Sequence, residues 1–239
     1  MKPATGIIPA RYRSTRFPGK ALAFILGKPL IQRVYEGAKR ARLLDQVIIA
    51  TDDERIFQVA RKFGAQVVMT SALHRSGTER VAEVARKIKT PIIINIQGDE
   101  PLIEGKMIDK LVKVLQDKSI LMASLMARVS DLNLLADSNR VKVVVDKKDY
   151  ALYFSRSPLP FQASRFFYQH IGIYGFKRDF LLKLVRLQPS RLEKMEKLEQ
   201  LRVLENGYRI KMVETDFLTL SVDLPQDIIK VEEILRKKE

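Results

Sequence analysis

The stretch PIIINIQGDEP, residues 91–101, is an unbroken apolar run followed by a polar turn. A short run rich in isoleucine is typical of a strand that is buried inside a sheet. Toward the N-terminus, three more β-branched runs (5–10, 46–53 and 65–70) alternate with amphipathic stretches. This order predicts β-α-β-α-β-α-β within the first hundred residues, which indicates a parallel sheet with helices on both faces.

Toward the C-terminus the pattern changes, because strands follow one another with fewer helices between them. The expected elements are strands at 120–129, 141–146, 151–156, 170–176 and 208–215, and helices at 195–207 and from Pro225 onward. Residues 141–156 predict a hairpin that turns at 147–149, and a proline suits the first turn of the last helix. We therefore expect one α/β domain over residues 1–239, with a mixed, mostly parallel sheet and a small antiparallel subregion at about 140–176.

The composition fits a globular protein, since 46% of the 239 residues are hydrophobic and 30% are charged. No run approaches the roughly 18 apolar residues of a membrane span, and Pro9 and Arg11 interrupt the only apolar stretch near the N-terminus. The chain contains no cysteine, which excludes disulfides and thiolate metal sites. We expect a cytoplasmic protein that does not insert into membranes.

The net charge of +15 raises the alternative of a nucleic-acid-binding protein. The other interpretation is a charged surface that keeps the protein in solution, as in some thermophilic proteins. The charges are spread over every segment, and neither an aromatic RNA-binding signature nor a helix-turn-helix pattern is present. We therefore predict that nucleic acid is not a partner.

The loop after the first strand, within IIPARYRSTRFPGK at residues 7–20, concentrates positive charge. Four of its side chains are cationic: Arg11, Arg13, Arg16 and Lys20. The loop is no Walker A motif, because Ser14 and Ala21 occupy positions where that motif needs Gly and Ser or Thr. Guanidinium, ammonium and backbone N–H groups on one turn can nevertheless surround a triphosphate. The alternative is a solvated basic loop.

Carboxylates follow other strands of the predicted sheet, at the edge where α/β proteins bind ligands. Asp52 ends one strand, Asp99 follows another in QGDEP, and Asp223 lies in LSVDLPQD. Mg²⁺ prefers one or two carboxylates together with phosphate oxygens. Asp99 and Asp223 are therefore candidate magnesium ligands for a bound nucleotide, although Asp223 could equally be the N-cap of the last helix.

An ordered set of motifs resembles the 3-deoxy-manno-octulosonate cytidylyltransferase family, from about residue 7 to the last helix. The motifs are IIPARYRSTRFPGK, HRSGTERVAEV, NIQGDEP, VKVVVD, YALYFSR, HIGIYGF, LEKMEKLEQLRVL and VDLPQD. The resemblance implies a three-layer, Rossmann-like nucleotide-diphospho-sugar transferase fold. It implies transfer of CMP from CTP to the anomeric 2-hydroxyl of 3-deoxy-D-manno-octulosonate (Kdo), giving CMP-Kdo and pyrophosphate for lipopolysaccharide biosynthesis. It also implies a cytoplasmic homodimer that uses Mg²⁺, with two ions when CTP is bound.

The same resemblance assigns roles to individual residues. The nucleotide-binding set is Arg11, Ser14, Arg16, Lys20, Thr51, Asp52, Ser76, Gly77, Arg80 and Gln97. The sugar-binding set is Gln97, Arg156, His170, Tyr174, Glu199 and Gln200. The catalytic set is Arg11, Lys20, Asp99 and Asp223, and the resemblance implies that the two aspartates hold the metal. By pattern alone, His170 could be a core histidine, Glu199 a solvated flank residue and Arg156 the partner of a local acid.

Two segments depart from the family pattern. Residues 161–169 are shorter and more apolar than expected, and FLTLSVD at 217–223 replaces a glycine-rich sequence. The first departure leaves lid contacts to the sugar open, and residues 161–167 are also a candidate dimer surface. The second leaves open how closely the backbone before Asp223 approaches the metals. The rivals are another cytidylyltransferase, such as one for sialic acid, a uridylyl- or adenylyltransferase, and a non-catalytic nucleic-acid-binding module.

Overall fold

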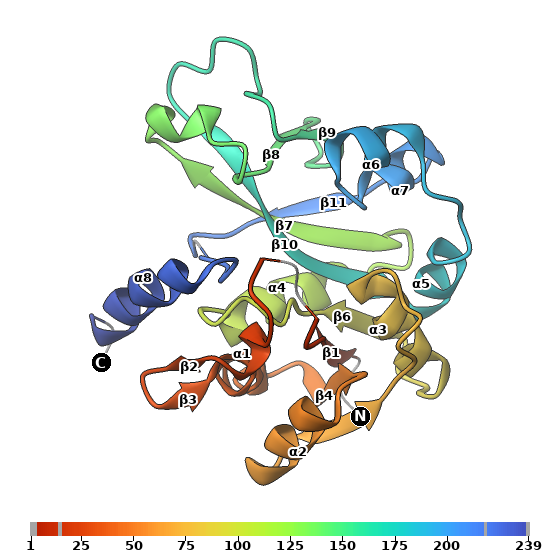
Figure 1. The fold of residues 1–239 in the computed structure, drawn as a ribbon. Helices are drawn as coiled ribbons and strands as arrows, with labels where there is room; N and C mark the ends of the chain where they lie inside the picture. Colours follow the sequence, from red (N-terminus) through yellow and green to blue (C-terminus); the bar gives the residue numbers. More distant parts are fainter. Residues whose placement is uncertain (1–3, 14–15, 218, 238–239) are drawn as a thin grey trace.

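A nine-stranded sheet forms the centre of the protein in this computed structural model, which describes residues 4–13, 16–217 and 219–237 (Figure 1). The strand order is β11-β7-β10-β6-β1-β4-β5, and β8 and β9 extend the sheet beside β10. The strands are β1 (Ala4–Ala10), β4 (Leu44–Thr51), β5 (Gln66–Met69), β6 (Ile92–Asn95), β7 (Met122–Val129), β8 (Lys142–Val145), β9 (Ala151–Ser155), β10 (Phe167–Lys177) and β11 (Lys211–Glu214).

The strand directions confirm a mixed, mostly parallel sheet. Strands β6, β1, β4 and β5 run parallel, and β7 and β11 are parallel to each other. Only β10 runs against both of its neighbours in this order, β6 and β7. The predicted antiparallel subregion is present, because β8 and β9 form a hairpin that pairs through β8 with β10.

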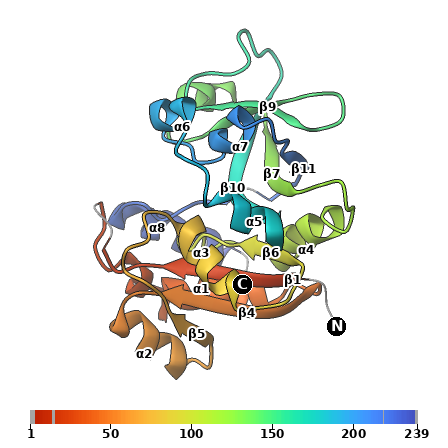
Figure 2. The same ribbon diagram turned by 90° about the vertical axis from the view of Figure 1, so that its right-hand side faces the viewer.

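Helices cover both faces of the sheet, which gives three layers (Figure 2). They are α1 (Leu30–Lys39), α2 (Glu54–Lys62), α3 (Gly77–Arg86), α4 (Gly105–Val114), α5 (Arg178–Leu184), α6 (Arg191–Glu196), α7 (Leu201–Glu205) and α8 (Pro225–Arg236). Ile8 packs in the core cluster under α1 and α4, whereas its neighbour Ile7 packs in the cluster under α3 and α5. Both faces of β1 are therefore buried. No helix within the described residues has the length and hydropathy to cross a membrane.

The helix predicted over 195–207 is wrong, because the chain forms two short helices, α6 and α7, with a turn between them. Lys197 ends α6 in the left-handed region with a φ of 55°. This turn buries Leu198 and Gln200, which are 6% and 4% exposed. The prediction also omitted α4, α5 and a small hairpin of β2 (Phe24–Ile25) and β3 (Lys28–Pro29).

The predicted hairpin turn at 147–149 is confirmed, and one side chain organises it. The carboxylate of Asp146 accepts hydrogen bonds from the backbone N–H groups of Lys148 (2.8 Å) and Tyr150 (2.9 Å). Asp149 occupies the left-handed region with a φ of 55°, which aspartate tolerates better than most residues. The turn therefore brings β8 and β9 into register.

A buried lysine joins this hairpin to its surroundings. Lys142 is fully buried, and its ammonium group donates to the carbonyl oxygens of Asp137 (2.9 Å), Arg140 (2.7 Å) and Arg156 (2.5 Å). Burial lowers the pKa of this ammonium group. The three carbonyl groups belong to segments on both sides of the hairpin, so one side chain ties them together.

We expect Lys142→Met to lower the free energy of unfolding by about 3 kcal/mol, because three buried carbonyl groups lose their donor. Urea unfolding followed by circular dichroism measures the change. The control is Lys147→Met at the exposed hairpin turn, where a change under about 0.5 kcal/mol is expected. Equal losses in the two variants would contradict the structural role of Lys142.

Candidate active site

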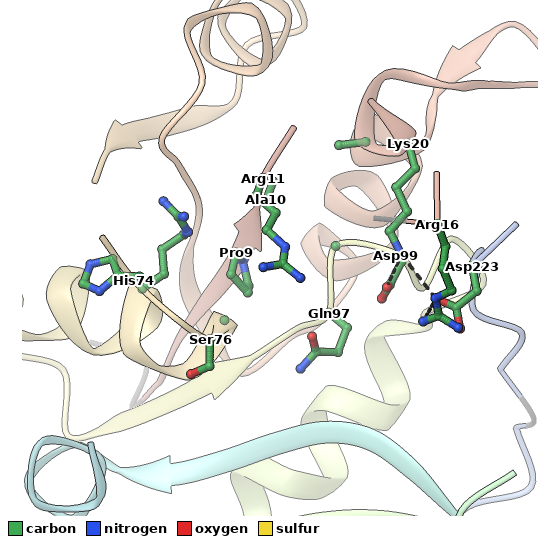
Figure 3. A pocket seen from close by; sticks show the side chains of 14 residues that line it. Pro9, Ala10, Arg11, Arg16, Lys20, His74, Ser76, Gln97, Asp99 and Asp223 are labelled. Atoms are coloured by element: carbon green, nitrogen blue, oxygen red, sulfur yellow. Dashed lines mark hydrogen bonds and ion pairs between the residues drawn. The ribbon is translucent and has the colours of Figure 1, made fainter. Parts of the chain in front are cut away.

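A cleft of about 230 Å³, partly open to solvent, lies at the carboxyl ends of β1 and β6. The residues that line it include nine that the sequence nominated: Arg11, Arg16, Lys20, Ser76, Gly77, Arg80, Gln97, Asp99 and Asp223. Figure 3 shows Lys20, Asp99, Arg16 and Asp223 together on one side of this cleft, with Arg11 and Gln97 beside them. We call the cleft the nucleotide pocket, after the role that the sequence resemblance gives to its residues. Ser14 lies outside the described residues.

Two carboxylates share one ammonium group in this pocket. The Nζ atom of Lys20 lies 2.6 Å from Asp99 Oδ2 and 3.5 Å from Asp223 Oδ1. Arg16 binds Asp223 from the solvent side at 2.8 Å. Positive groups from the opening loop thus meet acids that lie far away in the sequence, which is the arrangement that the sequence predicted for one end of the sheet.

A left-handed glycine aims Lys20 into the pocket. Gly19 has a φ of 73°, and its N–H donates to the carbonyl of Tyr12 at 2.9 Å. A side chain at position 19 would be strained at this φ and would lie 3.1 Å from the Tyr12 ring. The loop can therefore fold back on itself and present Lys20 as the first residue of a short 3-10 helix.

Backbone contacts set the position of Asp99. A Cβ atom on Gly98 would lie 2.7 Å from the Pro9 carbonyl oxygen, so only glycine lets this turn pack against the end of β1. The N–H of Val222 donates to the Asp99 carbonyl at 2.9 Å, and the Val222 carbonyl accepts from Lys20 at 2.9 Å. The backbone before Asp223 thus comes close to the acids even though 217–223 contains no glycine.

The N-terminus of α3 forms another wall of the nucleotide pocket. Ser76 is the N-cap, and its hydroxyl oxygen accepts from the N–H of Glu79 at 3.2 Å. The carboxylate of Glu199 lies close to the side chains of Ser76 and Thr78, and burial raises its pKa. Glu199 was assigned to the sugar by resemblance and to solvent by spacing, whereas its contacts lie at the start of α3.

Arg80 reaches the pocket while its guanidinium group is anchored behind it. The side chain is only 4% exposed, and it pairs with Asp52 at 3.0 Å and donates to the Thr70 hydroxyl at 2.5 Å. The predicted nucleotide residues Asp52 and Thr51 do not line the pocket. Asp52 holds Arg80, and the fully buried Thr51 accepts hydrogen bonds from Thr70 through its carbonyl oxygen.

His74 lines the same pocket but was given no role from the sequence. Its Nε2 atom lies 2.6 Å from the carboxylate of Glu83 on α3, which fixes the ring against the helix. The position falls inside the HRSGTERVAEV motif, nine residues before that acid. Neither helical nor strand periodicity marks His74 in the sequence, because it lies in the loop before α3.

A second, smaller pocket adjoins the first, and we call it the sugar pocket. Three of the predicted sugar-binding residues line it: His170, Tyr174 and Gln200. Glu100, the residue next to Asp99, lines it too, as do Thr219 and Ser221 from the segment before Asp223. Asp99 and Asp223 themselves line the nucleotide pocket, whereas Glu100 and Ser221, one and two positions away in the sequence, line the sugar pocket.

Two buried polar atoms in the sugar pocket have no partner within the described residues. They are Oε2 of Glu100 and Nε2 of Gln200. Glu100 is 6% exposed and Gln200 is 4% exposed. Burial and the neighbouring Asp99 raise the pKa of Glu100 to about 8. Since buried polar groups are almost always hydrogen-bonded, these atoms favour a polar ligand in this pocket.

Arg156 is not among the residues that line either pocket. Its side chain donates to the carbonyl oxygens of Glu196 (3.1 Å) and Ser138 (3.0 Å), and its own N–H donates to the Glu196 carboxylate at 2.9 Å. The guanidinium group thus joins α6 to the segment before β8. Its predicted contact with a sugar carboxylate stays a prediction.

His170 makes the stability of the protein sensitive to acid. Burial lowers its pKa from 6.5 to about 3, so the folded protein keeps the ring neutral while the unfolded chain protonates it below about 6.5. The unfolded state then binds more protons, and the free energy of unfolding falls as the pH drops from about 6.5 toward 3.

We expect this contribution to reach about 1 kcal/mol per pH unit and to be absent in His170→Gln. Urea unfolding of wild type and variant at pH 7, 6 and 5 measures the difference in slope. Tyr174→Phe, which retains His170, is the control and should keep the wild-type slope. Parallel pH profiles of wild type and His170→Gln would contradict the neutral, buried ring.

The two acids of the nucleotide pocket suit a magnesium ion that arrives with a nucleotide. Asp99 and Asp223 already converge on one cationic atom, Lys20 Nζ. No group of three or more His, Asp or Glu side chains that could hold a metal occurs in residues 4–13, 16–217 and 219–237. The pair therefore fits Mg²⁺ only with further oxygen ligands, such as those of a phosphate.

The fold and this site define a nucleotidyltransferase of the cytidylyltransferase class. The sequence pattern of the family described as "Cytidylyltransferase" matches residues 5–212. Two curated relatives are named 3-deoxy-manno-octulosonate cytidylyltransferase. One, from Geotalea uraniireducens, is 52% identical over 98% of this chain and 99% of its own; the other, from Geobacter metallireducens, is 53% identical over 98% of each. The chain belongs to the 3-deoxy-manno-octulosonate cytidylyltransferase family.

Solved structures agree with this assignment. A CMP:2-keto-3-deoxy-manno-octonic acid synthetase complexed with CTP superposes with a TM-score of 0.94 and 39% identity, covering 99% of both chains. A 4-diphosphocytidyl-2C-methyl-D-erythritol synthase from Anaerococcus prevotii superposes with a TM-score of 0.67 at 13% identity, over 98% of both chains. The second likeness concerns the fold alone, and the three-layer fold expected from the resemblance is confirmed.

Proposed function

We propose that this protein transfers CMP from CTP to the anomeric 2-hydroxyl of Kdo and releases pyrophosphate, a step of lipopolysaccharide biosynthesis. The observation that carries the proposal is the meeting of Lys20, Asp99 and Asp223 in the first pocket, while Glu100, the neighbour of Asp99, lines the second. One pocket is lined by cations and a helix N-terminus, which suits a nucleotide. The other presents buried polar atoms without partners, which suits a polyhydroxylated acceptor.

The chemistry requires positioning and charge stabilisation more than covalent help. Arg11, Arg16 and Lys20 offset the negative charge of the triphosphate and the charge that grows on pyrophosphate as it leaves. Ser76 and Gly77 hold the nucleoside side of CTP at the start of α3. The sugar pocket orients Kdo so that its 2-hydroxyl faces the α-phosphorus across the boundary formed by Asp99.

We propose that Asp99 and Asp223 hold Mg²⁺ when CTP is bound. The metal would lower the pKa of the attacking hydroxyl and neutralise phosphate charge. The Lys20 ammonium group lies 2.6 Å from Asp99 and 3.5 Å from Asp223. With CTP bound, the same ammonium group would donate to the phosphates, and the two carboxylates would hold the metal.

A pyrophosphate-release assay with CTP, Mg²⁺ and Kdo tests the proposal. We expect turnover with CTP and Kdo, little with UTP, ATP or GTP, and little with sialic acid. A preference for sialic acid or for another nucleotide would favour a different member of the fold. Salt-sensitive oligonucleotide binding without any pyrophosphate release would favour a nucleic-acid-binding module instead.

The cytoplasmic location and the homodimer stay predictions. Phe161, in the segment named as a candidate dimer surface, is 89% exposed, whereas Phe167 at the end of that segment is buried in the core. Sedimentation of the wild type and of Phe161→Ser tests this surface, because loss of a dimer in the variant is the expected result.

A further inference from the structure

Ser124 lies on β7 directly behind the sugar pocket and has no role in any motif discussed above. It is fully buried, and its hydroxyl oxygen has three neighbours. They are Nε2 of His170 at 2.8 Å, the carbonyl oxygen of Ile173 at 2.8 Å and the carbonyl oxygen of Ile171 at 3.3 Å.

These contacts determine where the protons lie. A hydroxyl group has a single proton to donate, and a carbonyl oxygen can only accept one. If Ser124 donates to Ile173, its lone pairs face His170, and Nε2 of the ring must carry a proton. The ring is neutral, because burial lowers its pKa to about 3. The other ring nitrogen, Nδ1, is then an acceptor.

A bulge explains why Ser124 donates to the backbone and not to the ring. The pairing of β10 with β7 shifts between Ile171 and Tyr174, so the residues between them have no counterpart on β7. Bulged residues lose part of their ladder hydrogen bonds, and buried carbonyl groups need another donor. Ser124 lies opposite the bulge and supplies it.

The pocket side of His170 matches a hydroxyl group. The ring is 7% exposed and lines the sugar pocket, and all of its hydrogen bonds to described residues are made through Nε2. Beside it, the Tyr174 hydroxyl donates to Oε1 of Gln200 at 3.1 Å. The other end of this amide, Nε2 of Gln200, is a donor without a partner among the described residues. The acceptor Nδ1 of His170 and the donor Nε2 of Gln200 thus belong to two residues that line the same pocket, and a sugar hydroxyl can pair with both.

We propose that Ser124 is a positioning residue that fixes His170 as the Nε2–H tautomer, so that Nδ1 accepts a hydrogen bond from a hydroxyl group of the bound sugar acid. The sugar part of this inference rests on the proposed function, whereas the tautomer part does not. The ligand class is a polyhydroxylated acid that presents a hydroxyl donor to Nδ1 and an acceptor to Gln200.

Nitrogen-15 NMR of the histidine rings tests the tautomer directly. The chain has only two histidines, and His74→Gln assigns them. At pH 7 we expect His170 of the wild type to show a protonated Nε2 and an unprotonated Nδ1. In Ser124→Ala the two nitrogen shifts should move toward each other, because the ring loses its acceptor, and Ser124→Thr should restore the wild-type pattern.

Steady-state kinetics provide the second readout. In Ser124→Ala the KM for Kdo should rise about tenfold, as expected for one misdirected hydrogen bond, while the KM for CTP changes less than twofold. The control is Thr5→Val, which removes another fully buried hydroxyl group, 2.8 Å from the Thr90 hydroxyl. It should leave the tautomer and both KM values unchanged.

A wild-type His170 protonated on Nδ1, or a Ser124→Ala enzyme with an unchanged tautomer and an unchanged KM for Kdo, would overturn the inference. A wild-type protein with the expected tautomer but no pyrophosphate release from CTP and Kdo would refute the proposed function instead. In that case the tautomer part stands and the sugar part falls.

Discussion

Replacing Asp99 with asparagine is expected to lower kcat/KM at least 100-fold, measured as pyrophosphate release with CTP, Kdo and Mg²⁺. The carboxylate lies 2.6 Å from Lys20 in the nucleotide pocket, and the next residue, Glu100, lines the sugar pocket. Asparagine keeps the shape but removes the charge that would hold a divalent cation. Losing one preorganised electrostatic group at a reaction centre typically costs a factor of about 10²–10³.

The control for Asp99→Asn is Asp45→Asn, the same exchange at an exposed position of β4. It should retain wild-type kinetics. Both variants should unfold within about 1 kcal/mol of the wild type, because Lys20 still has Asp223 as a partner after Asp99 is exchanged. Wild-type turnover by a folded Asp99→Asn enzyme would remove Asp99 from the reaction centre.

The central sheet was predictable because its signal is local. Isoleucine runs such as 92–94 are buried on both sides, and the helix periodicity of 30–41 marks residues that pack on the sheet. The carboxyl ends of parallel strands meet at one edge, so the order of strands alone predicts that Lys20 and Asp99 lie close together. The distance of 2.6 Å between them is the outcome of that topology.

The rest depended on contacts between distant segments. The helix expected at 195–207 breaks at Lys197, because burial of Leu198 and Gln200 outweighs a helical periodicity that continues through them. Glu199 then turns toward the hydroxyl groups of Ser76 and Thr78. No spacing rule links these positions, since more than a hundred residues separate them.

Supporting residues were also hidden from the sequence. Asp52 was expected at the nucleotide, but its carboxylate pairs with Arg80 and holds that side chain in the pocket wall. Ser124 lies inside an apolar strand and becomes meaningful only when β10 places His170 against it. Both depend on which strand or helix lies opposite, and this information is absent from a local pattern.

Lys20→Ala is expected to raise the KM for CTP and to lower kcat, with a combined loss in kcat/KM for CTP of about 100-fold or more. The Lys20 side chain is only 17% exposed, and both acids converge on its Nζ atom. We expect the KM for Kdo to change less than threefold, because the described hydrogen bonds of the Lys20 ammonium group go to Asp99 and Val222, which do not line the sugar pocket. The two Michaelis constants therefore separate its role from a general loss of structure.

Excess Mg²⁺ distinguishes two roles of Lys20, which are to neutralise Asp99 and Asp223 and to donate to the phosphates of CTP. A divalent cation can replace the ammonium group between Asp99 and Asp223, but it does not replace a donor to the phosphates. The defect of Lys20→Ala should therefore persist at saturating Mg²⁺, whereas Lys28→Ala, which removes the exposed pair with Glu36, should behave as wild type. Full recovery of Lys20→Ala by Mg²⁺ would show that Lys20 only neutralises the acids and does not bind the triphosphate.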